Sequence, residues 1–531
     1  MSEPTRKPLP LILIRGLGGL DVEDERQIAY QGFNDGTVYP QKRGENYIYE
    51  GLILRFMKSS WRYQDATNVV GYYANPIDQK PLTIPPELSF LKPDYFFGEK
   101  VIVDPAMALH LLRATEDPCR TVWVFRYYDL NDRKFEVYGK ALVRLIEFIR
   151  DMSAHKSQSG TRPKVNIIAH SMGGLLVREA VQRVYPEGEA GEHINKIVTL
   201  GTPHQGISFQ LIKNWLLIDA EKEVEHFNPE FQKNEQKNKA AFTLFGKHFP
   251  LERLLTVVGT NYRTYDVGAA SRLNRVFSIS GEFGPNYNRS DGLVKQTYAQ
   301  IPGAPRTFVH KCHGGADSLV TARESFEVAT RFFFGNIRSR LRLVKAKITR
   351  GQDFVGKSEF FFGVSIKPRR VDFDLFHQSA EADNCYGPFN KDDLSDANVA
   401  FSWAGRDRLI WEGYLDTSSI LEDKSITTKD MVLRLDFYVG ERDLFGVGFS
   451  DNVIFRKQYY VRALLEKSFA IYLHTDERFA TPGFSPLDTE EIKKVAGGWE
   501  FDVVGTGFQG TLRLELDKVP EEGEPVPFES I

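Results

Sequence analysis

Short apolar runs alternate with amphipathic stretches over roughly the first 340 residues. Runs of four or more largely apolar residues predict buried strands, and they lie at residues 10–14, 121–128, 165–169, 196–200, 276–280 and 306–312. Helices are predicted where apolar side chains recur at helical spacing: Leu142, Leu145, Ile146, Ile149, then Leu176, Ala180 and Val184, and again over 319–334. Continuous apolar strands that alternate with helices predict an α/β fold, with a mostly parallel sheet and helices on both faces.

The pattern changes beyond about residue 340, where apolar and polar positions alternate. Four apolar residues share one face of the segment MVLRLDFYV: Leu433, Leu435, Phe437 and Val439. Similar short segments are SEFFFGVSI, RLIWEGYLD, FAIYLHTD, WEFDVVG and TLRLELD. A period of two predicts an antiparallel all-β domain, sandwich-like in architecture. We therefore divide the chain into an α/β domain at 1–338 and an all-β accessory domain at 339–531.

Two long segments interrupt the strand and helix alternation. Residues from about 20 to 118 are rich in Tyr and Pro, have no steady periodicity, and are interpreted as an insertion. Residues 207–270 are charged and predicted to be helical, with an apolar patch made of Leu211, Ile212, Trp215, Leu216, Leu217 and Ile218. This patch could be a lid over an acyl pocket or a packed cap helix, and the sequence does not choose between them.

Composition narrows the classes of partner and cofactor. The chain has 531 residues, too many for one hydrophobic core, and a net charge of −3. That charge argues against a polyanion-binding surface, so nucleic acid is not an expected partner. Cys119, Cys312 and Cys385 are scattered and form no CxxC pair, which argues against a structural zinc site. We expect neither a metal nor an organic cofactor.

The sequence also bears on localisation. The N-terminal apolar run is too short for a secretory signal and is interpreted as the first buried strand. No stretch is long and apolar enough to cross a bilayer. The expected location is cytoplasmic, or outside the cell after export without a cleaved signal peptide.

One serine stands among small residues between a predicted strand and a predicted helix. The sequence around it is Ala169-His170-Ser171-Met172-Gly173-Gly174. A sharp turn there lifts the hydroxyl clear of the sheet and places the N–H of Met172 at a helix N-terminus, where it can stabilise an oxyanion. Small residues two before and two after the serine, here Ala169 and Gly173, are what such a turn tolerates. Ser171 is therefore the candidate nucleophile, and it needs a base and an acid.

At these residues the sequence resembles the α/β-hydrolase family, and within it the bacterial lipases. Four segments carry the resemblance: Arg15-Gly16-Leu17-Gly18-Gly19, the Ser171 turn, Gly201-Thr202-Pro203-His204-Gln205-Gly206 and Ser290-Asp291-Gly292-Leu293-Val294. The resemblance to this family covers about residues 8–335. The resemblance implies that the N–H of Leu17 is the second oxyanion donor. Arg15 stands where lipases usually have His. A dinucleotide-binding interpretation of the first glycines fails, because Asp21 occupies the third glycine position.

The chain order of the family, serine then acid then histidine, assigns the remaining roles. Asp291 is the expected acid, in a lipase-like context, with Asp317 as a weaker rival. His313 is the expected base because it precedes two glycines on a loop, whereas His310 is the alternative, inside an apparent strand. His170 is expected to shape the turn or the pocket.

Two further side chains near these motifs are expected to be structural. His204 is expected to hold the end of a strand below the site, and Cys312 to be a packed thiol.

The expected function is hydrolysis of carboxylic esters of lipids through an acyl-enzyme. An acyltransferase, a thioesterase or an amidase could use the same three residues. A protein of another class, an inactive hydrolase-like scaffold whose β-domain does the binding, is a further alternative. The β-domain could bind lipid or a partner surface, or could pack on the catalytic core, and peripheral contact with a membrane belongs to the same open question.

Overall fold

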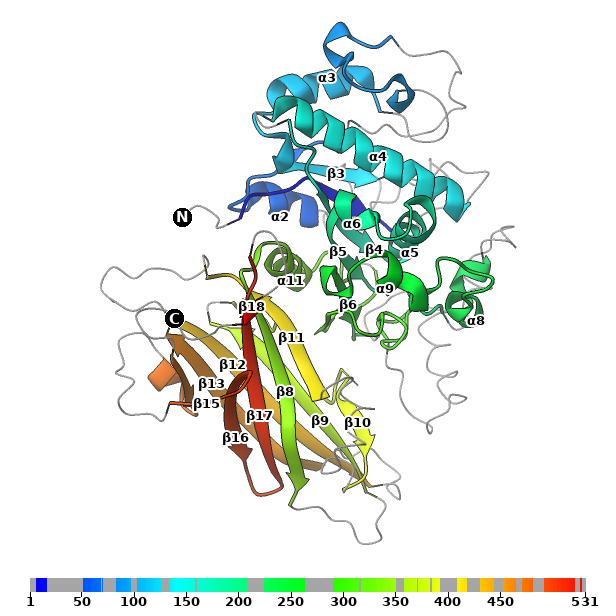
Figure 1. The fold of residues 1–531 in the computed structure, drawn as a ribbon. Coiled ribbons are helices and arrows are strands. Elements are labelled where there is room, and N and C mark those ends of the chain that lie inside the picture. The colour runs from blue at the N-terminus through cyan, green and yellow to red at the C-terminus, as the bar shows by residue number, and fades with distance from the viewer. Residues whose placement is uncertain are drawn as a thin grey trace, which may run out of the picture. The chain divides into compact units, whose positions relative to one another are not determined.

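The computed structural model describes residues 6–16, 51–67, 69, 83–96, 103–125, 134–157, 160–207, 224–262, 290–314, 317–349, 358–369, 371–382, 384–391, 408–417, 430–443, 452–464, 470–480, 491–520 and 526–527. Beyond the first six residues the chain divides into two compact units. The first comprises Lys7–Pro305 and Lys311–Ala329, and the second comprises Arg306–His310 and Thr330–Ile531. Figure 1 shows the elements of each unit.

Within the described residues a seven-stranded sheet has the order β2-β3-β1-β4-β5-β6-β7. Its strands are Leu11–Ile14 (β1), Gln64–Asp65 (β2), Thr121–Phe125 (β3), Val165–His170 (β4), Ile194–Leu200 (β5), Leu254–Gly259 (β6) and Arg306–Val309 (β7). The pairings from β2 through to β6 run parallel. Strands β1, β3, β4 and β6 are buried along their whole length, as expected for a sheet covered on both faces. The predicted α/β fold is confirmed.

Helices connect these strands. The α-helices are Leu52–Lys58 (α2), Pro105–Ala114 (α3), Phe135–Lys156 (α4), Met172–Glu179 (α5), Ala190–His193 (α6), Pro229–Lys233 (α8), Phe245–His248 (α9) and Arg323–Phe334 (α11). The long helix α4 buries the predicted apolar stripe Leu142, Leu145, Ile146 and Ile149. A π-helix at Ala180–Val184 continues α5.

Shorter 3-10 helices complete the described helical content. They are Pro86–Leu88 (η2), Pro93–Tyr95 (η3), Pro118–Arg120 (η4), Val224–Phe227 (η6), Phe242–Leu244 (η7), Leu251–Arg253 (η8) and Glu477–Ala480 (η12).

The structure corrects the sequence-based assignment at several places. Residues 254–259 were expected to lie in a helical cap but form the inner strand β6, because the run LLTVVG is apolar and rich in β-branched residues. The rest of the described cap consists of short helices. Helices α2 and α3 and the sheet strand β2 form inside the segment interpreted as an insertion without steady periodicity. Asp104 caps α3 by accepting hydrogen bonds from the backbone N–H groups of Ala106 and Met107. Strand β7 ends at Val309, so His310 lies just beyond the strand.

The second unit contains two antiparallel sheets in the described residues, with orders β10-β9-β12-β13-β14 and β11-β8-β17-β16-β15, and β18 pairs with β17. The strands are Ile337–Ile348 (β8), Ser358–Pro368 (β9), Tyr386–Phe389 (β10), Leu409–Leu415 (β11), Asp430–Asp443 (β12), Asn452–Leu464 (β13), Ala470–His474 (β14), Lys493–Val495 (β15), Gly498–Val504 (β16), Phe508–Lys518 (β17) and Val526–Pro527 (β18). The predicted all-β domain is confirmed.

Aromatic side chains fill the space between these two sheets. The Phe508 ring on β17 lies with its centroid 5.8 Å from that of Phe362 on β9 and 5.4 Å from that of Phe455 on β13. The predicted apolar face of β12 also points inward, with Leu435 and Phe437 almost fully buried. Alternate residues of each strand therefore meet in one core, which is the packing of a sandwich.

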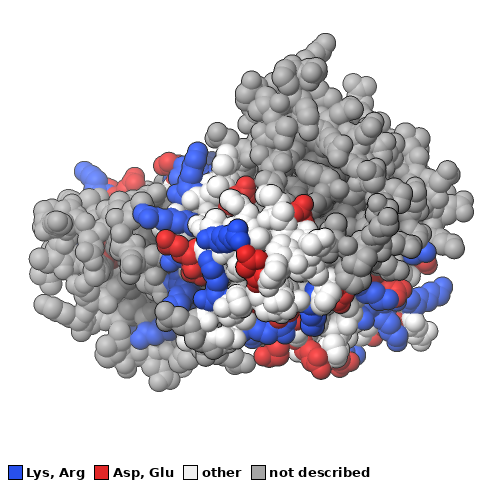
Figure 2. All heavy atoms as spheres, turned by 90° about the horizontal axis from the view of Figure 1, so that it is seen from above, with Lys and Arg blue, Asp and Glu red and all other residues white. Residues whose placement is uncertain are grey.

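Surface charge is mixed on one face of the described structure. Basic and acidic side chains lie interspersed on the face shown in Figure 2. This agrees with the small net charge of the whole sequence, −3.

Phe508→Ala should weaken the second unit because the side chain is fully buried between the sheets. Truncating a buried Phe costs about 3–5 kcal/mol of unfolding free energy, measurable by denaturant unfolding of the full chain. Val504→Ala is the matched control, since that side chain is 49% exposed and its loss should change the free energy by no more than about 0.5 kcal/mol. Equal effects of the two substitutions would contradict the sandwich core.

Candidate active site

Ser171 occupies the sharp turn between β4 and α5. Its backbone has φ 52° and ψ −125°, a conformation that residues other than glycine rarely adopt. Strand β4 ends at His170 and helix α5 begins at Met172. As the first residue of the helix, Met172 has a backbone N–H without an intrahelical acceptor.

Small residues are required around this turn because backbone and side chains approach it closely. A Cβ atom on Gly173 would lie 2.4 Å from the carbonyl oxygen of Arg15, and one on Gly174 would lie 2.1 Å from Oγ1 of Thr202. A Cβ on Gly16 would lie 2.7 Å from Cβ of Ser171. Glycines of two sequence motifs and Thr202 of a third therefore meet at the nucleophile turn.

The structure brings Ser171, His313 and Asp291 together, although they are far apart in sequence. Oγ of Ser171 lies 2.9 Å from Nε2 of His313, and Nδ1 of His313 lies 2.8 Å from Oδ2 of Asp291. Because a carboxylate only accepts, Nδ1–H donates to Asp291, which leaves Nε2 as the acceptor for the serine hydroxyl. All three residues are buried, with exposures of 5%, 4% and 1% respectively.

Asp291 is held by the backbone as well as by His313. Its Oδ1 accepts hydrogen bonds from the N–H groups of Leu293 at 3.0 Å and Val294 at 2.8 Å. Its own carbonyl oxygen accepts from the backbone N–H of His313 at 2.8 Å. Such donors stabilise a carboxylate in a buried site.

Two glycines at the ends of neighbouring strands leave room for this pair. A Cβ on Gly201, whose φ is +56°, would lie 2.8 Å from Oδ2 of Asp291 and 3.1 Å from Nδ1 of His313. A Cβ on Gly259 would lie 2.6 Å from Cβ of Asp291. Sequence reasoning did not assign these roles. The signal was present as a glycine immediately after each of two apolar strand runs.

His204 and the neighbouring Arg178 are packed below the strand ends. His204 is fully buried, and its Nε2 lies 3.0 Å from Oγ1 of Thr199. Burial lowers the pKa of His204 well below its usual range. Arg178 on α5 donates to the carbonyl oxygen of His204 at 2.7 Å and to Oε1 of Gln232 at 2.9 Å. These contacts join α5 to the Gly201–Gly206 turn and to α8.

The residues considered as alternatives for the base, the acid and the nucleophile have other partners. The ring of His310 lies next to His377, with centroids 5.8 Å apart, and belongs to the second unit. Nζ of Lys311 binds Oδ1 of Asp317 at 2.6 Å, so Asp317 has a cationic partner. The Cys312 thiol is buried and lies 3.1 Å from the carbonyl oxygen of Gly314, as expected of a packed side chain.

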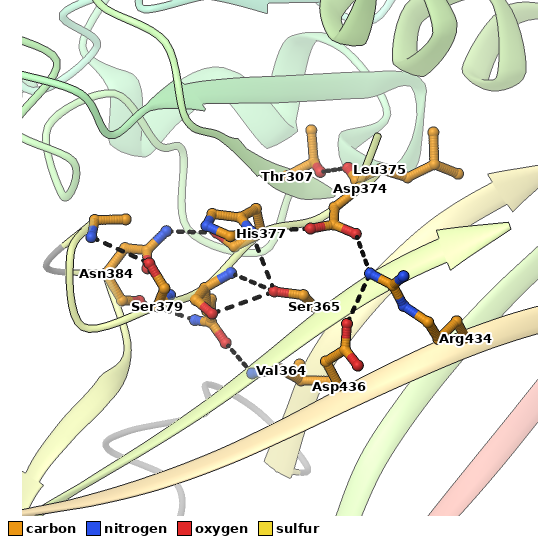
Figure 3. Close-up of polar contacts among 12 residues, drawn as sticks. Thr307, Val364, Ser365, Asp374, Leu375, His377, Ser379, Asn384, Arg434 and Asp436 are labelled. Atoms are coloured by element: carbon orange, nitrogen blue, oxygen red, sulfur yellow. Dashed lines mark hydrogen bonds and ion pairs between the residues drawn. The ribbon is translucent and has the colours of Figure 1, made fainter. Parts of the chain in front are cut away.

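The second unit contains another serine, histidine and aspartate close together (Figure 3). Nδ1 of His377 lies 3.0 Å from Oδ2 of Asp374 and 3.3 Å from Oγ of Ser365. Both partners approach the same ring nitrogen, so this histidine cannot relay a proton from the hydroxyl while the carboxylate holds its other nitrogen. Arg434 also binds Asp374, at 3.5 Å. The cluster is a polar network that joins strands and a loop.

Several predicted features lie outside the described residues. These are the oxyanion donor Leu17, the apolar patch 211–218 and the strand 276–280. Within the described ranges, His, Cys, Asp and Glu side chains form no group of three or more suited to hold a metal ion. None of the described helices combines the length and hydropathy needed to cross a membrane.

The parallel sheet and the serine at the turn after β4 together define an α/β-hydrolase fold. Residues 108–263 match the model of a family described as the PGAP1-like alpha/beta domain. This stretch includes α4, β4, the Ser171 turn and β6. Curated protein sequences give no match.

The solved structures similar to this chain include a lipase, a carboxyl esterase and a phospholipase. The mature lipase BlEst2 from Bacillus licheniformis is 14% identical, with a TM-score of 0.31 over 61% of this chain and 91% of that chain. The metagenomic carboxyl esterase MGS0156 is 12% identical, with a TM-score of 0.28 over 41% and 66%. Phospholipase PlaB from Legionella pneumophila is 11% identical, with a TM-score of 0.28 over 61% and 82%. Likeness at this level adds no evidence on activity.

Gly201→Ala should disturb the Asp291–His313 pair, because the new methyl group would meet both side chains. Gly188→Ala is a matched control: its φ is also positive, +81°, but a Cβ there has no neighbour within 4 Å. Both variants carry the backbone cost, so the difference between them measures overpacking. Denaturant unfolding should show Gly201→Ala to be less stable than Gly188→Ala by about 1–3 kcal/mol. Equal stability of the two variants would count against the tight packing described.

Proposed function

We propose that the chain is a serine hydrolase that cleaves carboxylic esters of lipids through an acyl-enzyme. The observation that supports this most is the continuous set of hydrogen bonds from Asp291 through His313 to Ser171. A hydroxyl needs such a base to become nucleophilic near neutral pH, and the base needs an acid that fixes its tautomer. The strained turn that presents the hydroxyl supports the same assignment.

In the first half of the reaction, Oγ of Ser171 attacks the ester carbonyl carbon while Nε2 of His313 takes the hydroxyl proton. The carbonyl oxygen becomes an oxyanion and accepts a hydrogen bond from the N–H of Met172. Leu17 is proposed as the second donor. The intermediate collapses as the carbon–oxygen bond to the alcohol breaks, and Nε2–H of His313 protonates the departing alcohol. Ser171 is left as an ester of the acyl group.

In the second half, water replaces the alcohol. His313 takes a proton from the attacking water, and the same donors stabilise the second oxyanion. The acid leaves as Oγ of Ser171 regains its proton from His313. Through both halves the carboxylate of Asp291 stays charged and stabilises the imidazolium of His313, aided by the backbone donors of Leu293 and Val294.

The proposed substrate class rests on the lipase-like motifs at the turn of Ser171 and around Asp291. An ester of a fatty acid, in an acylglycerol or a phospholipid, is the substrate that this resemblance favours. The mechanism above needs no metal ion, since the proton transfers and the oxyanion are served by groups of the chain.

A fluorophosphonate probe should label the wild-type protein, and Ser171→Ala should not be labelled, because the probe bonds only to an activated serine. The same substitution should lower ester turnover by at least about 1,000-fold. Ser365→Ala is the matched control, since that serine is also buried beside a histidine and an aspartate but lacks the relay. Absence of labelling in the wild type, with the protein folded, would support an inactive scaffold instead.

Substituting the two histidines separately should distinguish the base from its neighbour in sequence. His313→Ala should abolish labelling and turnover, because no other imidazole in the described residues lies within hydrogen-bonding distance of Oγ of Ser171. His310→Ala should retain more than about a tenth of the activity, since its ring lies beside His377. Loss of turnover only in His310→Ala would overturn the assignment of the base.

A further inference from the structure

A second imidazole lies beside the proposed triad, and the mechanism above does not use it. His170 is the last residue of β4 and directly precedes Ser171. Its side chain is buried, and its ring centroid lies 4.9 Å from that of His313. A buried imidazole must satisfy its polar atoms within the protein, so its partners indicate its role.

His170 connects to the backbone of the base. Its Nε2 lies 2.9 Å from the main-chain carbonyl oxygen of His313, and because that oxygen only accepts, Nε2–H is the donor. The N–H of His313 donates to the carbonyl oxygen of Asp291. Both main-chain polar groups of His313 are thus hydrogen-bonded, one by the acid residue and one by His170.

The other edge of the same ring faces the loop after β1. A Cβ on Gly16 would lie 3.0 Å from Nδ1 of His170 and 2.7 Å from Cβ of Ser171. His170 therefore lies between two segments that flank the nucleophile: the loop that carries the base, and residues Arg15 and Gly16 directly after β1. A side chain here can set the position of one segment against the other.

We propose that His170 is a positioning residue: its Nε2–H holds the carbonyl of His313 and so keeps the imidazole of His313 directed at Ser171. This inference rests on the proposed function. A displacement of about 1 Å between reacting groups can cost about 100-fold in rate, so a single backbone hydrogen bond at the base has a measurable effect.

The charge of His170 fits this role. Burial, and secondarily the nearby His313, lowers the pKa of His170 to about 3. The ring of His170 is therefore neutral near neutral pH. A neutral donor holds the loop without opposing the positive charge that His313 acquires when it takes the serine proton, which a lysine or arginine at this position would oppose.

Three variants of His170 separate the hydrogen bond from mere packing. His170→Gln keeps an uncharged N–H donor with the reach of Nε2, His170→Leu removes the donor at similar size, and His170→Asn carries an amide too short to reach the carbonyl. His110→Leu, at an exposed position on α3, is the control for loss of a histidine. The measurements are kcat and KM for a soluble ester, the rate of fluorophosphonate labelling, and hydrogen–deuterium exchange of the backbone around residues 311–314.

The expected result is a fall of about 10- to 100-fold in kcat and labelling rate for His170→Leu and His170→Asn, with KM little changed. His170→Gln should stay within a few-fold of wild type, and His110→Leu should equal it. Exchange at 311–314 should accelerate in the Leu and Asn variants and not in the Gln variant. If either His170→Leu or His170→Asn fails to fold, the other carries the same test.

The inference is overturned if folded His170→Leu or His170→Asn keeps wild-type kcat, or if His170→Gln loses as much activity as His170→Leu. Failure of the proposed function has a different signature, because wild-type protein would then show no turnover and no labelling that depends on Ser171. In that case the exchange rates still decide whether His170 holds the backbone of His313. Equal exchange in all variants would show that the hydrogen bond from His170 does not hold this backbone.

Discussion

The close approach of backbone around Ser171 is the constraint on which the rest of the site depends. The serine adopts a positive φ that costs free energy, and the surrounding contacts must hold it there. The packing leaves the turn no other position. Gly16, just after β1, lies against Ser171. Gly173 lies against the carbonyl of Arg15, and Gly174 lies against the side chain of Thr202. The turn is thus fixed by β1, β4 and the segment after β5 together.

The carboxylate of Asp291 and the imidazole of His313 are packed just as closely. Asp291 and His313 are almost fully buried, and burying a carboxylate without hydrogen-bond donors would be costly. Backbone N–H groups supply the donors, and Gly201 and Gly259 supply the room. Different parts of the chain therefore meet the two requirements. The loop after Asp291 donates the hydrogen bonds to its carboxylate, and the glycines at the ends of β5 and β6 leave room for its side chain.

Comparison of the two Ser, His and Asp clusters shows why composition alone does not make a site. In the first unit the carboxylate and the hydroxyl contact opposite nitrogens of His313, so Nε2 can accept the hydroxyl proton while Asp291 holds Nδ1–H. In the second unit both contact Nδ1 of one ring, that of His377. The second arrangement links a loop to the strands of the sandwich. The sandwich itself is held together by its aromatic core. The two clusters differ in which ring nitrogens the carboxylate and the hydroxyl contact. The identity of the three residues does not determine this.

The sequence by itself determined the alternation of elements, the turn at Ser171 and the two fold classes, because hydrophobic periodicity and small residues at a sharp turn are local properties. It pointed to Asp291 and His313 only through the order known for a family, and left His310 open. It missed β6, since a short apolar run among charged neighbours is ambiguous between strand and helix. Only the tertiary structure decided which imidazole faces Ser171, and which glycines leave room for Asp291, because these are distances between segments up to about 140 residues apart. Such distances are set by strand order and packing, which no local pattern specifies.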